Sequence, residues 1–216
     1  MPPEMRDARV QQDPSEALSR MVSSFRDVCA FTRTTTIGDQ PPSTHKELML
    51  VSPAAEGRDI PSLVSREEVD FHGAPVVKVD EFAGFGDALL VQVGQFSGLG
   101  RRVHSGMGKV RHSFGRYALR CVVFHIGEGP FGHYVASVHT PRGWVRCDDS
   151  SKSDPFPGSK PDYPHHNPSL LLYVREDLWA PLARIRTFTN LGQTCWCNSL
   201  SQMIMCLLQH RSHICA

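Results

Sequence analysis

The stretch of residues 117–126 most constrains what this chain can fold into. Its centre, Cys121 to Phe124, is apolar at four consecutive positions. Successive side chains of a strand point to opposite faces, so this strand is apolar on both faces and its sheet must be covered on each side. Other apolar runs bounded by glycine or proline predict further strands of the same sheet, at residues 75–79, 88–93, 134–139, 144–147 and 169–174.

Two segments have apolar residues at the three- and four-residue steps of a helix. The first is predicted over residues 15–31, with Ser15 as a possible cap and an apolar face of Leu18, Met21, Val22, Phe25, Val28 and Cys29. The second begins at Cys195 after a cap at Thr194, and its stripe is Leu200, Met203, Ile204, Leu207 and Leu208. Together with the strands, these helices indicate an α+β fold.

Composition excludes several classes of protein. The 216 residues carry 23 Lys and Arg against 22 Asp and Glu, a net charge of +1, so no basic excess exists for nucleic acid or an anionic membrane. No apolar run approaches the ~18 residues of a membrane span. The start of the chain lacks an apolar signal segment. Seven cysteines, an odd number, indicate thiols in a reducing compartment, which predicts a cytoplasmic or nuclear protein.

The predicted organisation has four parts. Residues 1–14 are polar and form a disordered lead-in. Residues 15–175 hold the first helix and the sheet, although residues 32–69 mix short apolar pieces with turn clusters and no element is assigned there. Residues 176–188 are a linker, and residues 189–216 hold the second helix.

Cys195 is the candidate nucleophile because of its place at the start of a helix. Unpaired N–H groups and the helix dipole stabilise a thiolate there. On position alone, however, a small buried cysteine is the commoner interpretation. The surrounding residues 189–199, TNLGQTCWCNS, decide between the two.

This segment closely resembles the cysteine box of the ubiquitin-specific proteases, which are papain-like cysteine peptidases. The matching residues are Asn190, Leu191, Gly192, Thr194, Cys195, Asn198, Ser199 and Gln202, whereas Gln193, Trp196 and Cys197 depart from the pattern. Residues 117–149, YALRCVVFHIGEGPFGHYVASVHTPRGWVRCDD, resemble the histidine box of the same family at nearly every fixed position.

The resemblance implies a papain-like fold, with an antiparallel palm sheet and a buried helix that bears the cysteine. It also implies Cys195 as nucleophile, His133 as base and Asp148 as the acid that orients the imidazole. Asn190 would donate to the oxyanion, with Asp149 and Gln202 in supporting roles. The implied partner is ubiquitin or a ubiquitinated protein, and no cofactor is expected.

Two further motifs bear on dinucleotide binding and on metal binding. Residues 127–132 read G-x-G-x-x-G after a strand, but a short strand and a turn follow instead of the helix that a dinucleotide site needs. Many members of the resembled family have paired CxxC zinc ligands, whereas this chain has no CxxC pair. The resemblance therefore implies that Cys29 is the survivor of a lost zinc site. The tail residues Cys206, His210, His213 and Cys215 match no standard zinc spacing, and no metal is expected.

The order of the two boxes is inverted relative to the family. His133 and Asp148 precede Cys195, which indicates a circular permutation or a fragment that spans two tandem copies. In the family a helical thumb follows the cysteine helix, and from these residues we expect it to be missing. We therefore expect either a deubiquitinating peptidase, an inactive ubiquitin-binding remnant, or a chain completed by a separate thumb-supplying segment.

Overall fold

Strand β8 (Tyr117–Ile126) lies inside a large sheet, at the residues that the sequence predicts. The computed structural model describes residues 14–53, 61, 63–94, 107, 109–127, 132–158, 160–161, 163, 166–179, 185–191 and 194–214. Within them this sheet, here called the palm sheet, has the order β11 (Ser151–Lys152), β10 (Gly143–Asp148), β9 (His133–Thr140), β8, β12 (His166–Arg175), β6 (Ala88–Gly94) and β3 (Leu50–Pro53), and β7 (Ser113–Phe114) also pairs with β8. Only the β3–β6 pair among these is parallel.

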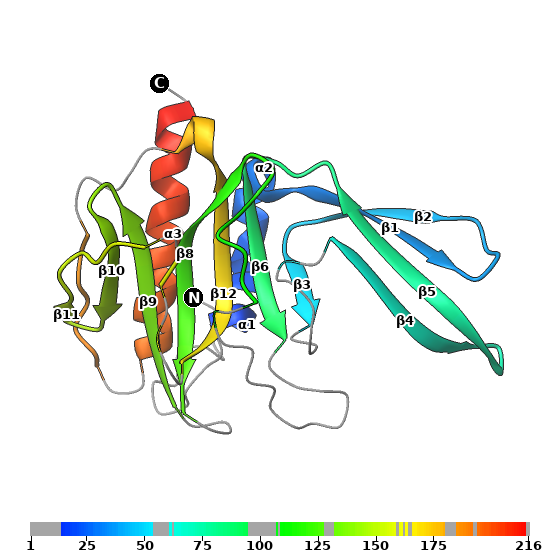
Figure 1. Cartoon of the computed structure of the whole chain (residues 1–216), viewed down its shortest axis with the longest axis horizontal. Coiled ribbons are helices and arrows are strands. Elements are labelled where there is room, and N and C mark those ends of the chain that lie inside the picture. The colour runs from blue at the N-terminus through cyan, green and yellow to red at the C-terminus, as the bar shows by residue number, and fades with distance from the viewer. Residues whose placement is uncertain are drawn as a thin grey trace.

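Both faces of the palm sheet are covered, as the apolar centre of β8 predicts. Cys121 and Val123 pack in one core cluster, whereas Val122 and Phe124 pack in the other, and all four are fully buried. The first cluster is covered by α1 (Pro14–Met21), α2 (Arg26–Cys29) and α3 (Cys195–Ile214), which lie on the same face (Figure 1). The second cluster is covered by loop and edge residues, which include Met107, Val110, Phe114, Phe156 and Tyr163.

A second, four-stranded sheet projects from the side of the palm sheet near β3 and β6 (Figure 1). We call it the finger sheet, and its order is β2 (Ser43–Glu47), β1 (Phe31–Ile37), β5 (Ala74–Ala83) and β4 (Val64–Phe71). The prediction that residues 75–79 belong to one sheet with the others is therefore wrong. Most side chains of β5 are exposed or half-buried, because this narrow ribbon has no extensive contact with any helix of the described residues.

The N-terminal helix is shorter and more broken than predicted. It consists of α1, the 3₁₀ turn η2 (Val22–Phe25) and α2, and Phe31 already belongs to β1. Ser15 lies within α1 because the helix begins at Pro14, a residue favoured in the first turn. Leu18, Phe25 and Val28 are buried as the helical spacing predicts.

Helix α3 begins at Cys195, as predicted, and contacts β8, β9 and β10. Leu200, Met203 and Leu207 are buried against the palm sheet, whereas Leu208 is 50% exposed. The lead-in at residues 1–13 and residues 180–184 of the predicted linker lie outside the described residues. No helix in the described ranges combines the length and the hydropathy needed to cross a membrane.

Candidate active site

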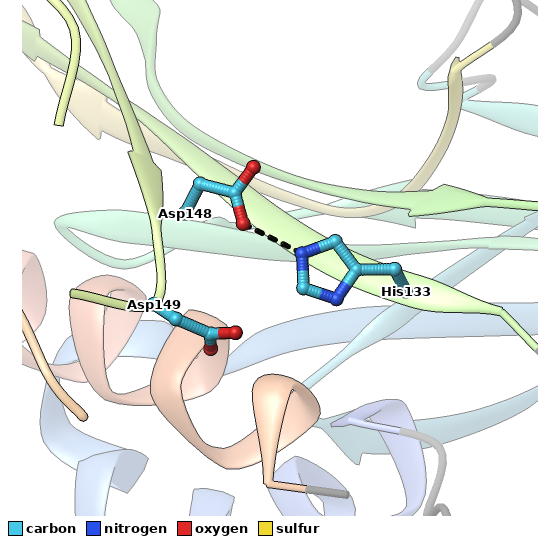
Figure 2. A group of neighbouring side chains, drawn as sticks. All are labelled: His133, Asp148 and Asp149. Atoms are coloured by element: carbon cyan, nitrogen blue, oxygen red, sulfur yellow. Dashed lines mark hydrogen bonds and ion pairs between the residues drawn. The ribbon is translucent and has the colours of Figure 1, made fainter. Parts of the chain in front are cut away.

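His133 is the first residue of β9, and its side chain lies beside the end of the neighbouring strand β10. The β9–β10 hairpin pairs Ala136 with Cys147, which brings Asp148 next to the start of β9. The Nε2 atom of His133 lies 2.6 Å from Oδ1 of Asp148 (Figure 2). The hairpin register thus sets the pair that the resemblance implies, although fifteen residues separate the two in sequence.

The turn of this hairpin fixes the register. Thr140 donates a hydrogen bond from Oγ1 to the carbonyl of Gly143 at 2.7 Å. Gly143 has φ of +119°, and a Cβ placed there would lie 2.3 Å from the carbonyl oxygen of Phe156. Only glycine fits this left-handed position against a neighbouring backbone.

Asp148 accepts a second hydrogen bond, which was not predicted from the sequence. Its Oδ2 accepts from Nη2 of Arg146 at 2.9 Å. Arg146 precedes Asp148 by two residues on β10, so both side chains leave the same face of the strand. That spacing was the signal available in the sequence, and it becomes informative only once β10 and the role of Asp148 are known.

Asp149 joins the segment before α3 to the palm sheet. Its two carboxylate oxygens accept hydrogen bonds from the side-chain amides of Asn190 and Asn198, both at 2.7 Å. Its carbonyl oxygen accepts a bond from the N–H of Phe188 at 3.1 Å. Asp149 has φ of +50°, a conformation that aspartate tolerates better than most residues. Its carboxylate therefore contacts these amides, and the contribution of Asn198 was not predicted.

Asn190 lies beside the site, five residues before Cys195. Its Nδ2 binds Asp149, and its Oδ1 accepts a hydrogen bond from Oγ1 of Thr194 at 3.1 Å. An amide nitrogen carries two hydrogens, so the bond to Asp149 leaves a second N–H that can serve an oxyanion.

Thr194 occupies the predicted cap position, because its carbonyl accepts the bond from the N–H of Asn198 that opens α3. Its hydroxyl also accepts from the N–H of Leu191 at 3.0 Å. The cap thus shapes the loop before α3 as well as the helix start.

Cys195 lies at the N-terminus of α3, where backbone N–H groups without a partner within the helix point toward the site. The residue is buried, with 4% of its surface exposed. Hydrogen bonding to the Cys195 side chain is the largest cause that raises the pKa of His133, to about 9, and the Asp148 carboxylate raises it further. The Cys195 sulfur and the Asp148 carboxylate thus both favour the charged form of His133.

Gln202 lies one helical turn beyond Asn198 and is buried. Its Nε2 donates a hydrogen bond to the carbonyl of Arg186. The bond fastens the segment that precedes the cysteine box onto α3. Gln202 therefore supports the site through the backbone that leads to it.

One group of side chains has the composition of a metal site. His133, Asp148 and Asp149 offer ligand atoms within 4.8 Å of one another. Hydrogen bonds to His133, Arg146 and the two asparagine amides account for the position of these carboxylates, so we assign no ion to them.

The cysteines considered as zinc ligands are placed differently. Cys29 and Cys206 are fully buried in the core beneath the helices. Burial raises the pKa of Cys29 to about 12, which disfavours the thiolate that zinc requires. The side chains of His210 and His213, and all of Cys215, lie outside the described part of the chain, as does most of the glycine motif at 127–132.

Comparison with solved structures assigns the fold to a class. No protein-family model and no curated protein sequence matches the chain. The chain has the fold of ubiquitin-specific proteases, at a sequence identity low enough that the likeness concerns the fold alone.

The solved structures that the chain resembles include SAGA DUB modules. One contains Ubp8, Sgf11, Sus1 and Sgf73, at 18% identity and a TM-score of 0.51. A second, from yeast, has 16% identity and a TM-score of 0.52. A third is bound to monoubiquitin, at 16% identity and a TM-score of 0.51. Each match covers 69% of this chain and 41% of the solved chain.

Proposed function

We propose that this chain is a deubiquitinating cysteine peptidase of the ubiquitin-specific type. One observation carries the proposal: the His133 ring is hydrogen-bonded to Asp148 at 2.6 Å, and Cys195, at the start of a buried helix, is the largest cause of the raised pKa of that ring. A nucleophile, a base and an orienting acid in contact are the requirements for thiol-dependent acyl transfer. The two sequence boxes and the shared fold support the same class.

In the proposed reaction, the Cys195 thiolate attacks the carbonyl carbon of the bond that follows the C-terminal glycine of ubiquitin. The second N–H of Asn190 and the N–H groups at the start of α3 stabilise the oxyanion. As the C–N bond breaks, the His133 imidazolium gives its proton to the leaving amine. Water then attacks the carbonyl carbon of the thioester and gives a proton to His133. The C–S bond breaks, the Cys195 thiolate leaves, and ubiquitin is released with a free carboxylate.

Asp148 serves the base in both steps. Its Oδ1 fixes Nε2 of His133, so the other ring nitrogen, Nδ1, faces the reacting groups. The carboxylate also stabilises the imidazolium that forms when His133 takes a proton. Asp149 has a separate task, because it aligns Asn190 with α3.

The choice of ubiquitin as substrate rests on the family resemblance and on the solved structure bound to monoubiquitin. We also propose that a thumb-supplying segment completes the substrate channel. On α3, Cys197, Ile204 and Met205 are only partly buried and Leu208 is half exposed. A covering helix would bury this stripe. A circular permutation, or a fragment that spans two tandem copies, would each give the observed order of the boxes.

The test is covalent capture with a ubiquitin whose C-terminus carries an alkyne electrophile. We expect a single adduct on Cys195 that is lost in Cys195→Ala and kept in Cys197→Ala, the matched control two residues away. An adduct that survives Cys195→Ala, or no adduct on the folded chain alone or with an added thumb segment, would overturn the peptidase assignment.

A second candidate is a non-catalytic ubiquitin-binding protein. The observation that favours it is the engagement of Asn190 by Asp149 and Thr194, which occupies part of its amide. This candidate predicts ubiquitin binding without turnover, with an affinity unchanged by Cys195→Ala. Turnover of a fluorogenic ubiquitin substrate would reject it.

A further inference from the structure

Arg146 lies between the Asp148 carboxylate and an aromatic ring. Its Nη2 donates to Oδ2 of Asp148 at 2.9 Å, while Oδ1 of the same carboxylate lies 2.6 Å from His133. The guanidinium carbon of Arg146 lies 5.5 Å from the centre of the Tyr163 ring, within the range of a cation–π contact. The guanidinium is therefore fixed from two directions.

The Tyr163 ring is itself held in place by the palm sheet. Its hydroxyl lies 3.1 Å from the hydroxyl of Ser137 on β9. The ring also makes edge contacts with Phe124 and Phe156, at centroid distances of 5.3 and 5.8 Å. We call Tyr163, Phe124 and Phe156 the aromatic shelf. Because Phe124 is fully buried in the second core cluster, the shelf links Arg146 to that core.

The Asp148 carboxylate needs such a fixed partner. About a third of its side chain is exposed (34%), so water competes for its oxygens. A carboxylate that is bound through one oxygen only can rotate away from its partner, whereas two bonds in one plane restrict that rotation. Arg146 supplies the second bond from the same strand.

We propose that Arg146 is a positioning residue that holds the Asp148 carboxylate in the orientation His133 requires. The proposal rests on the proposed function only in taking His133 as the base. Tyr163 then acts on the titration of His133 through Arg146 and Asp148.

Two physical effects of Arg146 oppose each other, so the sign of the change is diagnostic. The titratable or charged groups around the His133 ring are Cys195 of α3, Asp148 and Asp149 at the end of β10, and Arg146. If Arg146 acted only through its charge, its removal would favour the imidazolium and raise the His133 pKa. If it positions Asp148, its removal frees the carboxylate and lowers that pKa.

The experiment is an NMR titration of the His133 ring, with its signal assigned by comparison with His133→Gln. We expect Arg146→Gln to lower the midpoint by about one pH unit, the lower end of the effect of a nearby opposite charge. Arg146→Lys should restore at least half of the shift because it keeps a donor and a charge. Arg142→Gln, an exposed arginine in the β9–β10 turn, is the control and should leave the midpoint unchanged.

An unchanged or raised midpoint in Arg146→Gln would overturn the proposal. If that variant does not fold, Tyr163→Leu removes the shelf and leaves Arg146 in place, and an unchanged midpoint there would also overturn it. The titration needs no turnover. If Arg146→Gln lowers the His133 midpoint but the chain never captures the ubiquitin electrophile, the proposed function is wrong and the positioning role of Arg146 stands. If the chain captures the electrophile but the midpoint does not fall, the positioning role is wrong and the proposed function stands.

Discussion

The bonds of Asp149 give the sharpest test of how the segment before α3 is held. Asp149→Ala removes two hydrogen bonds to a carboxylate, each worth ~1.5–3 kcal/mol, and the partial exposure of the site places each at the lower end. Alanine at a φ of +50° adds ~1 kcal/mol of strain. We therefore expect a loss of ~4 kcal/mol in the free energy of unfolding.

Asp149→Asn separates these contributions. Asparagine tolerates the left-handed conformation and keeps one acceptor oxygen, so we expect a loss of ~1–2 kcal/mol from the missing bond. Urea denaturation followed by tryptophan fluorescence measures both variants against Asp154→Ala, an exposed aspartate close by in sequence. Hydrogen exchange should also accelerate at residues 185–191.

Unfolding of Asp149→Ala at the same urea concentration as the Asp154→Ala control would contradict this prediction. Hydrogen exchange that accelerates uniformly, and not in the segment before α3, would contradict it as well. Either result would mean that Asn190 and Asn198 are held without the carboxylate.

Three further predictions concern the hairpin, α3 and pH. Gly143→Ala should lower the melting temperature by several degrees, because its Cβ would meet the Phe156 carbonyl and because φ of +119° strains alanine by ~1–3 kcal/mol; an unchanged melting temperature refutes this. Leu207→Ala should cost ~2–5 kcal/mol and Leu208→Ala less than ~1 kcal/mol in urea denaturation, since only the first is buried, and equal costs would contradict it. The raised pKa of His133 stabilises the fold fully below the unfolded value of 6.5 and is lost as pH rises through about 9, so stability should fall across that window by ~1 kcal/mol after solvent screening, and should do so less in His133→Gln.

Much of the palm sheet could be predicted from sequence, because burial on both faces leaves a strong local signal. The strand at 117–126 matches β8 at both ends, and α3 begins at the predicted Cys195. The finger sheet could not be predicted beyond the strand at 75–79, because β1 reads FTRTTTI and β2 reads STHKE. Strand β1 pairs with β5 and β2 pairs with β1, and neither β1 nor β2 has an apolar face that would signal this pairing in the sequence.

Some residues of the site could likewise be predicted from sequence and others could not. Sequence boxes identify His133, Asp148 and Cys195 as candidates, and the hairpin register places His133 beside Asp148. Arg146 could not be chosen in advance, since arginine is common on exposed surfaces, and Asn198 matched the cysteine box without an assigned role. Their importance depends on which carboxylate each one meets after folding.

The most direct test of the proposed active site is an NMR titration of the His133 ring in the chain and in Cys195→Ala. Hydrogen bonding to the Cys195 side chain is the largest cause that raises the pKa of His133, to about 9. We therefore expect Cys195→Ala to lower the midpoint of His133, whereas Cys197→Ala should leave it unchanged. A His133 midpoint that is the same in the chain and in Cys195→Ala would show that sulfur and imidazole do not form the proposed pair.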